Sequence, residues 1–193
     1  MPHAARATHA MGADLRYECL NGDTYRITLT IYRDCLGSPL TDQQNIAFES
    51  ASCGVARFIE QANRVSINEI SPLCPAQQPN STCNGGIFPG VEEHVYELVY
   101  TLPQNCVDWR ISWQLCCRNF AITNSVITPN TRIYIESYLN NLTVTCNNSP
   151  YFTTLPVPYL CDGEPFSFNN GAIDPDGDSL AFSLIDPRDY AGG

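Results

Sequence analysis

The sequence predicts an all-β protein, built as a disulfide-rich β-sandwich that is followed by an incomplete immunoglobulin- or cadherin-like β domain. Three observations lead to this prediction. Apolar and polar residues alternate in several runs, turn-forming residues bound each run, and the 193 residues include ten cysteines. Alternation with a period of two is typical of half-buried strands. With 44% hydrophobic residues, a chain of this length can bury a sizeable core.

The clearest strand is Tyr25–Tyr32, in which apolar residues at odd positions alternate with more polar ones at even positions. Asn21–Asp23 directly before it has the composition of a tight turn, so Leu15–Leu20 is expected to be the partner strand of a hairpin. Four further runs alternate in the same way and are expected to be strands: Val95–Leu102, Arg110–Cys116, Thr131–Leu139 and Leu142–Cys146.

Two segments leave a helical alternative open, and one segment predicts a long loop. Gln43–Glu49 and Cys53–Asn63 have residual helical patterning, although neither has convincing helix caps. Ser71–Gly90 is rich in Pro, Asn, Gly and Cys, which predicts an excursion from the sandwich. Cys74 and Cys83 lie within this excursion, and a bond between them would staple it to itself.

A domain boundary is expected near Asn147–Pro150. Residues 1–13 are interpreted as a leader or extended N-terminal arm, residues 14–147 as the disulfide-stapled sandwich, and residues 148–193 as the first half of a second domain. The second part opens with the proline-spaced, extended segment Tyr151–Tyr159. Two short strands are expected after it, at Glu164–Phe168 and Ser179–Ile185. Strands from a neighbour or from a longer chain would complete such a half-domain.

The cysteines predict disulfides and an oxidising, extracytoplasmic compartment. No Cys-x-x-Cys pair occurs and only three histidines are present, which argues against zinc sites. Cys116 and Cys117 are adjacent in the sequence. Adjacent cysteines on a strand point to opposite faces and reach different partners, so this pair is also expected to form structural disulfides. A bond between the two cysteines that flank the boundary, 146 and 161, would brace the junction. The candidates are Cys19, Cys35, Cys53, Cys74, Cys83, Cys106, Cys116, Cys117, Cys146 and Cys161.

The charge excludes two classes of partner. The formal net charge is −10, and all ten basic residues are arginine. Nucleic acid and anionic membrane surfaces would both repel such a protein. No apolar run approaches the roughly 20 residues that a membrane-spanning helix needs, so membrane insertion is not expected.

The acidic turn Asp174–Asp178 is the sharpest candidate for a binding site. Asp174, Asp176 and Asp178 alternate around Gly177, and three carboxylates in this pattern can converge on one Ca2+ ion. A solvated turn that joins two strands is the alternative, because Asp and Gly form such turns without a metal.

Catalytic motifs give no candidate residues. Nucleophile-elbow, zinc-protease and phosphate-binding patterns are all missing from the sequence, so an enzyme is not expected. Trp109 and Trp113 lie four residues apart on one expected strand and therefore share a face. Carbohydrate-binding modules use aromatic platforms of this kind, whereas a pair of core tryptophans is the commoner outcome.

Four segments resemble one family of proteins: Thr8–Cys19, Tyr25–Cys35, Cys116–Asn119 and Gly171–Leu180. They are similar to the mature start of large exported Bacteroidota surface proteins of the gliding-motility-associated C-terminal-domain and PKD-repeat type. The resemblance covers almost the whole chain. Its opening block is fairly specific, whereas the acidic block also occurs in many cadherin-like and immunoglobulin-like repeats.

The resemblance implies export by the type IX system and a long chain of β-sandwich repeats at the bacterial cell surface. We therefore expect a non-catalytic extracellular structural or adhesive protein, such as a subunit of a surface filament or of a repeat adhesin. A carbohydrate-binding module is the alternative. The expected partners are other copies of the chain or neighbouring repeat domains, joined by strand addition through Tyr151–Tyr159, and glycans. The resemblance also implies that the acidic turn Asp174–Asp178 is a calcium-binding loop.

Overall fold

The structure is a computed structural model that describes residues 10–116, 132–156, 163, 165–169, 171–186 and 188. None of the helices in these ranges is long and apolar enough to cross a membrane. Their elements follow in the order β1 (Ala10–Asn21), β2 (Thr24–Asp34), β3 (Gln43–Ser50), β4 (Val55–Glu69), η1 (Pro75–Asn80), η2 (Thr82–Asn84), β5 (Val91–Thr101), β6 (Trp109–Leu115), β7 (Ile133–Leu139), β8 (Tyr151–Phe152) and β9 (Ala172–Ile173).

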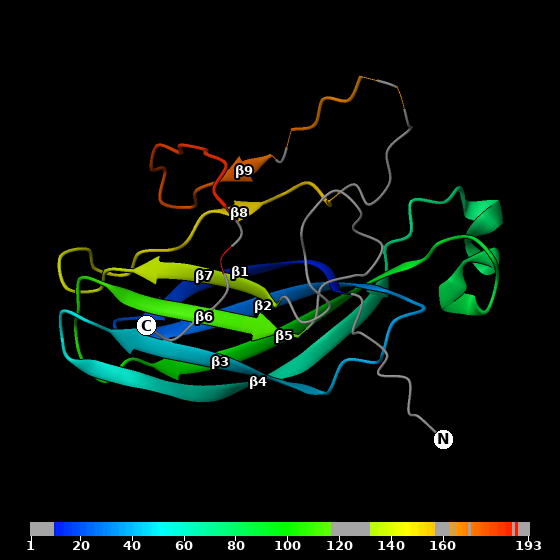
Figure 1. Ribbon diagram of the computed structural model, residues 1–193. Coiled ribbons are helices and arrows are strands. Elements are labelled where there is room, and N and C mark those ends of the chain that lie inside the picture. Colours follow the sequence, from blue (N-terminus) through cyan, green and yellow to red (C-terminus); the bar gives the residue numbers. More distant parts are fainter. Residues whose placement is uncertain are drawn as a thin grey trace.

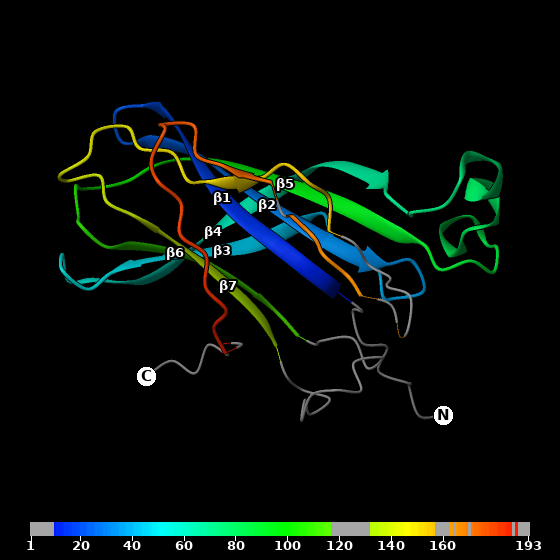
Figure 2. The same ribbon diagram turned by 90° about the horizontal axis from the view of Figure 1, so that it is seen from above.

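The predicted all-β class is confirmed, and seven strands form one antiparallel sheet in the order β1-β2-β5-β4-β3-β6-β7. The sheet curls until its first and last strands approach each other, as Figures 1 and 2 show. The expected sandwich of two sheets is not confirmed, because hydrogen bonds continue from strand to strand through the whole set. The predicted hairpin at Asn21–Asp23 is confirmed, with Gly22 at φ 54° in the turn between β1 and β2.

Strand β4 is the corner around which the sheet curls. Its first part, up to Asn63, pairs with β3, and its last part, Asn63–Glu69, pairs with β5. The register with β5 shifts between Arg64 and Ser66, so Val65 is an extra residue at a β-bulge. A bulge bends its strand and increases the local twist, which lets one long strand serve both sides of the sheet.

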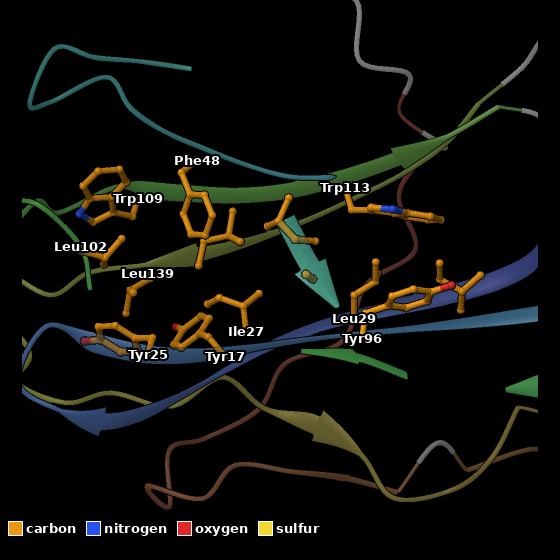
Figure 3. Close-up of a cluster of buried hydrophobic side chains, with 14 of the residues drawn as sticks. Tyr17, Tyr25, Ile27, Leu29, Phe48, Tyr96, Leu102, Trp109, Trp113 and Leu139 are labelled. Carbon is orange, nitrogen blue, oxygen red and sulfur yellow. The ribbon is translucent and has the colours of Figure 1, made fainter. Parts of the chain in front are cut away.

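The core fills the space inside the curled sheet. Figure 3 shows side chains from β3, β6 and β7, including Phe48, Trp109 and Leu139, facing those from β1, β2 and β5. Phe48 also stacks on Phe58, with ring centroids 5.5 Å apart. Alternate residues supply the inner face of each strand, as the period of two requires. The largest fully buried side chains are Trp109, Trp113, Tyr25, Tyr96, Phe48, Ile27, Leu29, Ile31, Ile46, Ile111, Leu139 and Val91.

Both segments with a helical alternative are strands in the structure. Gln43–Glu49 lies in β3, and most of Cys53–Asn63 lies in β4. The helical interpretation is therefore wrong. In β3 the buried side chains Gln44, Ile46 and Phe48 recur at every second position, which places them on one face of a strand and not of a helix.

Three segments that were predicted to be strands are irregular. Leu142–Cys146 forms turns, and Cys146 has a left-handed φ of 59° that a strand does not allow. In Glu164–Phe168 the described residues 165–168 form no strand, and neither does Ser179–Ile185. The short β8–β9 pair takes their place, because Tyr151 and Phe152 pair with Ile173 and Ala172.

The part of the chain after Ser149 has no core of its own among the described residues. Ser149 is 5% exposed, and none of the described residues from Pro150 onward is buried. β8 and β9 contribute only two residues each, and they lie outside the curled sheet (Figure 1). This segment is therefore held in place by the sheet beside it.

Candidate functional site

The edge of β1 is where the chain that leaves the sheet is attached. β1 and β7 are the two edge strands, and they share no ladder of backbone hydrogen bonds. Tyr17 links them, because its hydroxyl donates a 2.9 Å hydrogen bond to the backbone carbonyl of Tyr138. Asn147 donates a further hydrogen bond of 3.2 Å to the same hydroxyl.

Ser149 and Asn148 take the place of a neighbouring strand beside β1. The backbone N–H of Ser149 donates to the carbonyl of Tyr17 at 3.0 Å, and the N–H of Tyr17 donates to Ser149 Oγ at 2.9 Å. Two residues further along, the N–H of Cys19 donates to Asn148 Oδ1 at 2.8 Å. Unpaired groups at a sheet edge are templates for association, and these bonds satisfy three of them, namely the N–H and carbonyl of Tyr17 and the N–H of Cys19.

A disulfide fixes the same contact covalently. Cys19 is bonded to Cys146, across 127 residues of sequence. The residues from Cys146 to Ser149 are therefore held to β1 by one covalent bond and by several hydrogen bonds within four consecutive positions. We call this set, namely Tyr17, Cys19, Cys146, Asn148 and Ser149, the exit lock.

The acidic turn is bonded to the exit lock. Asp176 accepts a 2.6 Å hydrogen bond from the backbone N–H of Asn148 and a 2.9 Å bond from its side-chain amide. Asp174 stabilises the turn itself, because its Oδ1 accepts from the N–H of Asp176 at 2.8 Å. Both carboxylates thus have protein partners.

The predicted calcium ligands do not converge in this arrangement. In the described part of the chain, the one group of three residues at metal-ligand spacing is Cys35, Cys83 and Glu92. Its two sulfur atoms are joined in a disulfide and offer no thiolate. Asp176 faces Asn148 instead of sharing a centre with Asp174 and Asp178. Calcium binding at this turn stays a prediction.

A buried charged cluster lies inside the sheet, close to the disulfide between Cys35 and Cys83. The Arg33 guanidinium donates to Glu92 Oε2 from Nη2 at 2.7 Å and from Nε at 3.1 Å. His94 Nε2 lies 2.9 Å from the same oxygen. His94 is 3% exposed, and its buried Nδ1 has no hydrogen-bond partner among the residues that the structure describes.

The surroundings shift the pKa values of this cluster. Burial lowers the pKa of His94 below its ordinary 6.5, against the opposing hydrogen bond and charge of Glu92. Arg33 and Arg64 add to the lowering through their positive charges. Burial alone would raise the pKa of Glu92, but the hydrogen bonds from His94 and Arg33, together with their charges, hold it below its ordinary 4.5.

Of the two interpretations of the tryptophans, the core pair is confirmed and the ligand platform is wrong. Trp109 is 0% and Trp113 is 2% exposed, and both face the core from β6. Their indole N–H groups donate to Gln104 O at 3.2 Å and to Gln44 Oε1 at 3.1 Å. A buried tryptophan with a satisfied N–H is a packing residue, so neither ring can receive a ligand.

The disulfide prediction is confirmed for most cysteines but not for the two suggested pairings. The bonds are Cys19–Cys146, Cys35–Cys83 and Cys53–Cys106, and Cys116 is disulfide-bonded as well. Cys74 is free and exposed, so the bond from Cys74 to Cys83 within the excursion is wrong. The brace from Cys146 to Cys161 is also wrong, because Cys146 is bonded to Cys19. Cys117 and Cys161 lie outside the described residues.

Comparisons with known proteins identify no relative. Family models give no match, and searches against curated proteins and solved structures give none either. The functional interpretation therefore depends on the geometry of the exit lock and of the sheet around it.

The first prediction concerns pH. Because the pKa of His94 is lowered in the folded state, its neutral form contributes stability above pH 6.5, and this stability is lost as the pH falls through the folded pKa. Glu92 adds a second loss below pH 4.5. Chemical unfolding at a series of pH values measures both losses. His94→Gln keeps a hydrogen-bond donor to Glu92. It should abolish the loss of stability that His94 causes below pH 6.5 and leave the loss that Glu92 causes below pH 4.5. Equal pH profiles for both proteins would contradict the assignment.

The second prediction separates a hydrogen-bonded junction from a calcium loop. Asp176→Ala removes the acceptor of two hydrogen bonds and should lower the free energy of unfolding by about 0.5–1.5 kcal/mol and speed proteolysis after Ser149. Asp178→Ala is the matched control, because its carboxylate has no hydrogen-bond partner among the described residues. If the turn is a calcium loop, both variants will lose stability equally and EDTA will destabilise the parent protein.

Proposed function

We propose that the protein is a non-catalytic structural or adhesive module of a bacterial cell surface, of the exported Bacteroidota type that its sequence resembles. The observation that carries the proposal is the exit lock. Cys19–Cys146 and the hydrogen bonds of Ser149 attach the departing chain to β1. A chain that leaves a domain in this way passes load to the next domain through fixed bonds and not through a flexible linker.

The cysteines support an extracellular setting. Disulfides persist in oxidising compartments and are rare where thiols are kept reduced. Each of the three bonds closes a long loop, of 48 to 127 residues. Bonds of this kind typically stabilise a fold by about 2–4 kcal/mol each, which suits a protein exposed to proteases and shear.

Exposed apolar side chains support contact with a further domain. Soluble monomers rarely leave large contiguous apolar surfaces uncovered, so we propose that a neighbouring repeat or a second copy of the chain packs on this segment. Several large apolar side chains after Pro150 are at least one third exposed: Phe152, Leu155, Phe166, Phe168, Ile173, Phe182, Leu184 and Ile185.

The third prediction tests the proposed location and role. Antibodies against the sheet, residues 10–149, are applied to intact and to permeabilised cells of the source organism and are visualised with gold in the electron microscope. Labelling of intact cells, arranged along filaments or over a surface layer, is the expected result. Labelling that requires permeabilisation would contradict a surface location, and scattered single particles would contradict a filament or layer.

A further inference from the structure

A second feature of the surface is a groove on the outer face of β1, β2 and β5. The segment from Pro150 to Leu155 crosses this face, and Figure 2 shows β8 and the residues after it above these strands. A groove of about 330 Å³ lies between this segment and the sheet. Small-molecule sites typically occupy roughly 300–1,000 Å³, so the groove has the size of a binding site for a small ligand.

The strand register sets the floor of the groove. Asp14 on β1 is opposite Thr30 on β2, which is opposite Val95 on β5. Directly opposite residues on one face of a sheet have their Cβ atoms about 4.5–5.5 Å apart. The adjacent rows place Arg16 beside Thr28 and place Tyr32 beside Glu93. The floor is therefore a compact array: Asp14, Arg16, Thr28, Thr30, Tyr32, Glu93 and Val95.

Part of this floor is buried and fixed. Tyr32 is 9% exposed, and its hydroxyl donates a 3.1 Å hydrogen bond to Asp14 Oδ2. Its ring lies against Gly12, where an added Cβ would meet Tyr32 Cδ2 at 3.8 Å. Burial raises the pKa of Asp14, although the bond from Tyr32 and the charge of Arg16 oppose the shift.

The floor also contains two threonine hydroxyls. Thr28 is 4% exposed, yet no hydrogen bond among the described residues holds its hydroxyl or that of Thr30. At the roof, the Arg16 guanidinium carbon lies 5.4 Å from the centroid of the Tyr151 ring. The groove thus combines threonine hydroxyls, a fixed carboxylate and aromatic rings in one place.

We propose that this groove binds a neutral glycan. Sugar hydroxyl groups both donate and accept, so they match threonine hydroxyls together with a carboxylate acceptor. The apolar C–H face of a sugar ring packs on an aromatic side chain, which Tyr151 and Phe152 supply. Two carboxylates against one guanidinium give the groove a negative balance, which disfavours uronic or sulfated sugars.

The test is a calorimetric titration of the whole chain with neutral oligosaccharides, namely the cello-, manno- and xylo-series, and with an oligogalacturonate as the acidic probe. Saturable binding of at least one neutral series is expected. Thr30→Val is nearly isosteric, removes one hydroxyl and should weaken that binding about fivefold or more. Thr24→Val is the control, on the outer face of the same strand and beyond the groove. The Thr24 hydroxyl hydrogen-bonds to Thr101, outside the groove, so its loss should leave the affinity unchanged.

Several outcomes would overturn the glycan site. These are no binding of any neutral series, equal affinity of Thr30→Val and the parent chain, or tighter binding of the acidic probe. The same comparison can be made with Phe152→Ala. The Phe152 side chain is half exposed on β8, outside the seven-stranded sheet, so its removal leaves that sheet intact. Self-association that neutral sugars do not compete with would assign the groove to another copy of the chain. Labelling at the cell surface does not depend on any of these results.

Discussion

The contact between Tyr17 and Ser149 is the interaction on which the rest of the structure depends. A curled sheet whose two edges do not pair leaves unsatisfied backbone groups, which invite association with another strand. Ser149 and Asn148 satisfy the β1 edge at Tyr17 and Cys19, and the disulfide to Cys146 prevents them from leaving. Since the acidic turn hydrogen-bonds to Asn148, the same few residues also hold this turn in place.

This attachment explains how the outer groove arises. Because the chain leaves the sheet at the β1 edge, Pro150 and β8 are carried across the outer faces of β1, β2 and β5. The roof of the groove is thus a consequence of the exit lock, whereas its floor is a consequence of strand register. The interior of the sheet is separate, and there Glu92 joins Arg33 and His94 beside the Cys35–Cys83 bond.

Local patterns predicted β1, β2, β5, β6, β7 and the hairpin, because alternation and turn chemistry act within a few residues. They left a helical alternative for β3 and β4, and they predicted strands at three segments that are irregular. They did not predict contacts between distant residues. Nothing near Cys146 indicates that its partner is Cys19 rather than Cys161, since pairing depends on the curl of the sheet. The sequence places Thr28, Thr30 and Tyr32 on one face, but only the register with β1 and β5 brings Asp14 and Glu93 beside them. The two tryptophans show a further limit of local patterns. Their spacing predicts that they share one face of a strand, but it does not predict whether this face is buried or exposed.

Amide hydrogen exchange along β1 tests the exit lock most directly, because one strand contains both the test sites and their controls. The amides of Tyr17 and Cys19 donate to Ser149 and Asn148. Those of Ala13 and Leu15 occupy the same alternate positions of the β1–β2 ladder and therefore point to the same edge. Outside the strand ladders, neither amide donates a hydrogen bond to another group of the described residues. We expect Tyr17 and Cys19 to exchange at least about tenfold more slowly than Ala13 and Leu15. Equal exchange rates at all four positions would contradict the exit lock.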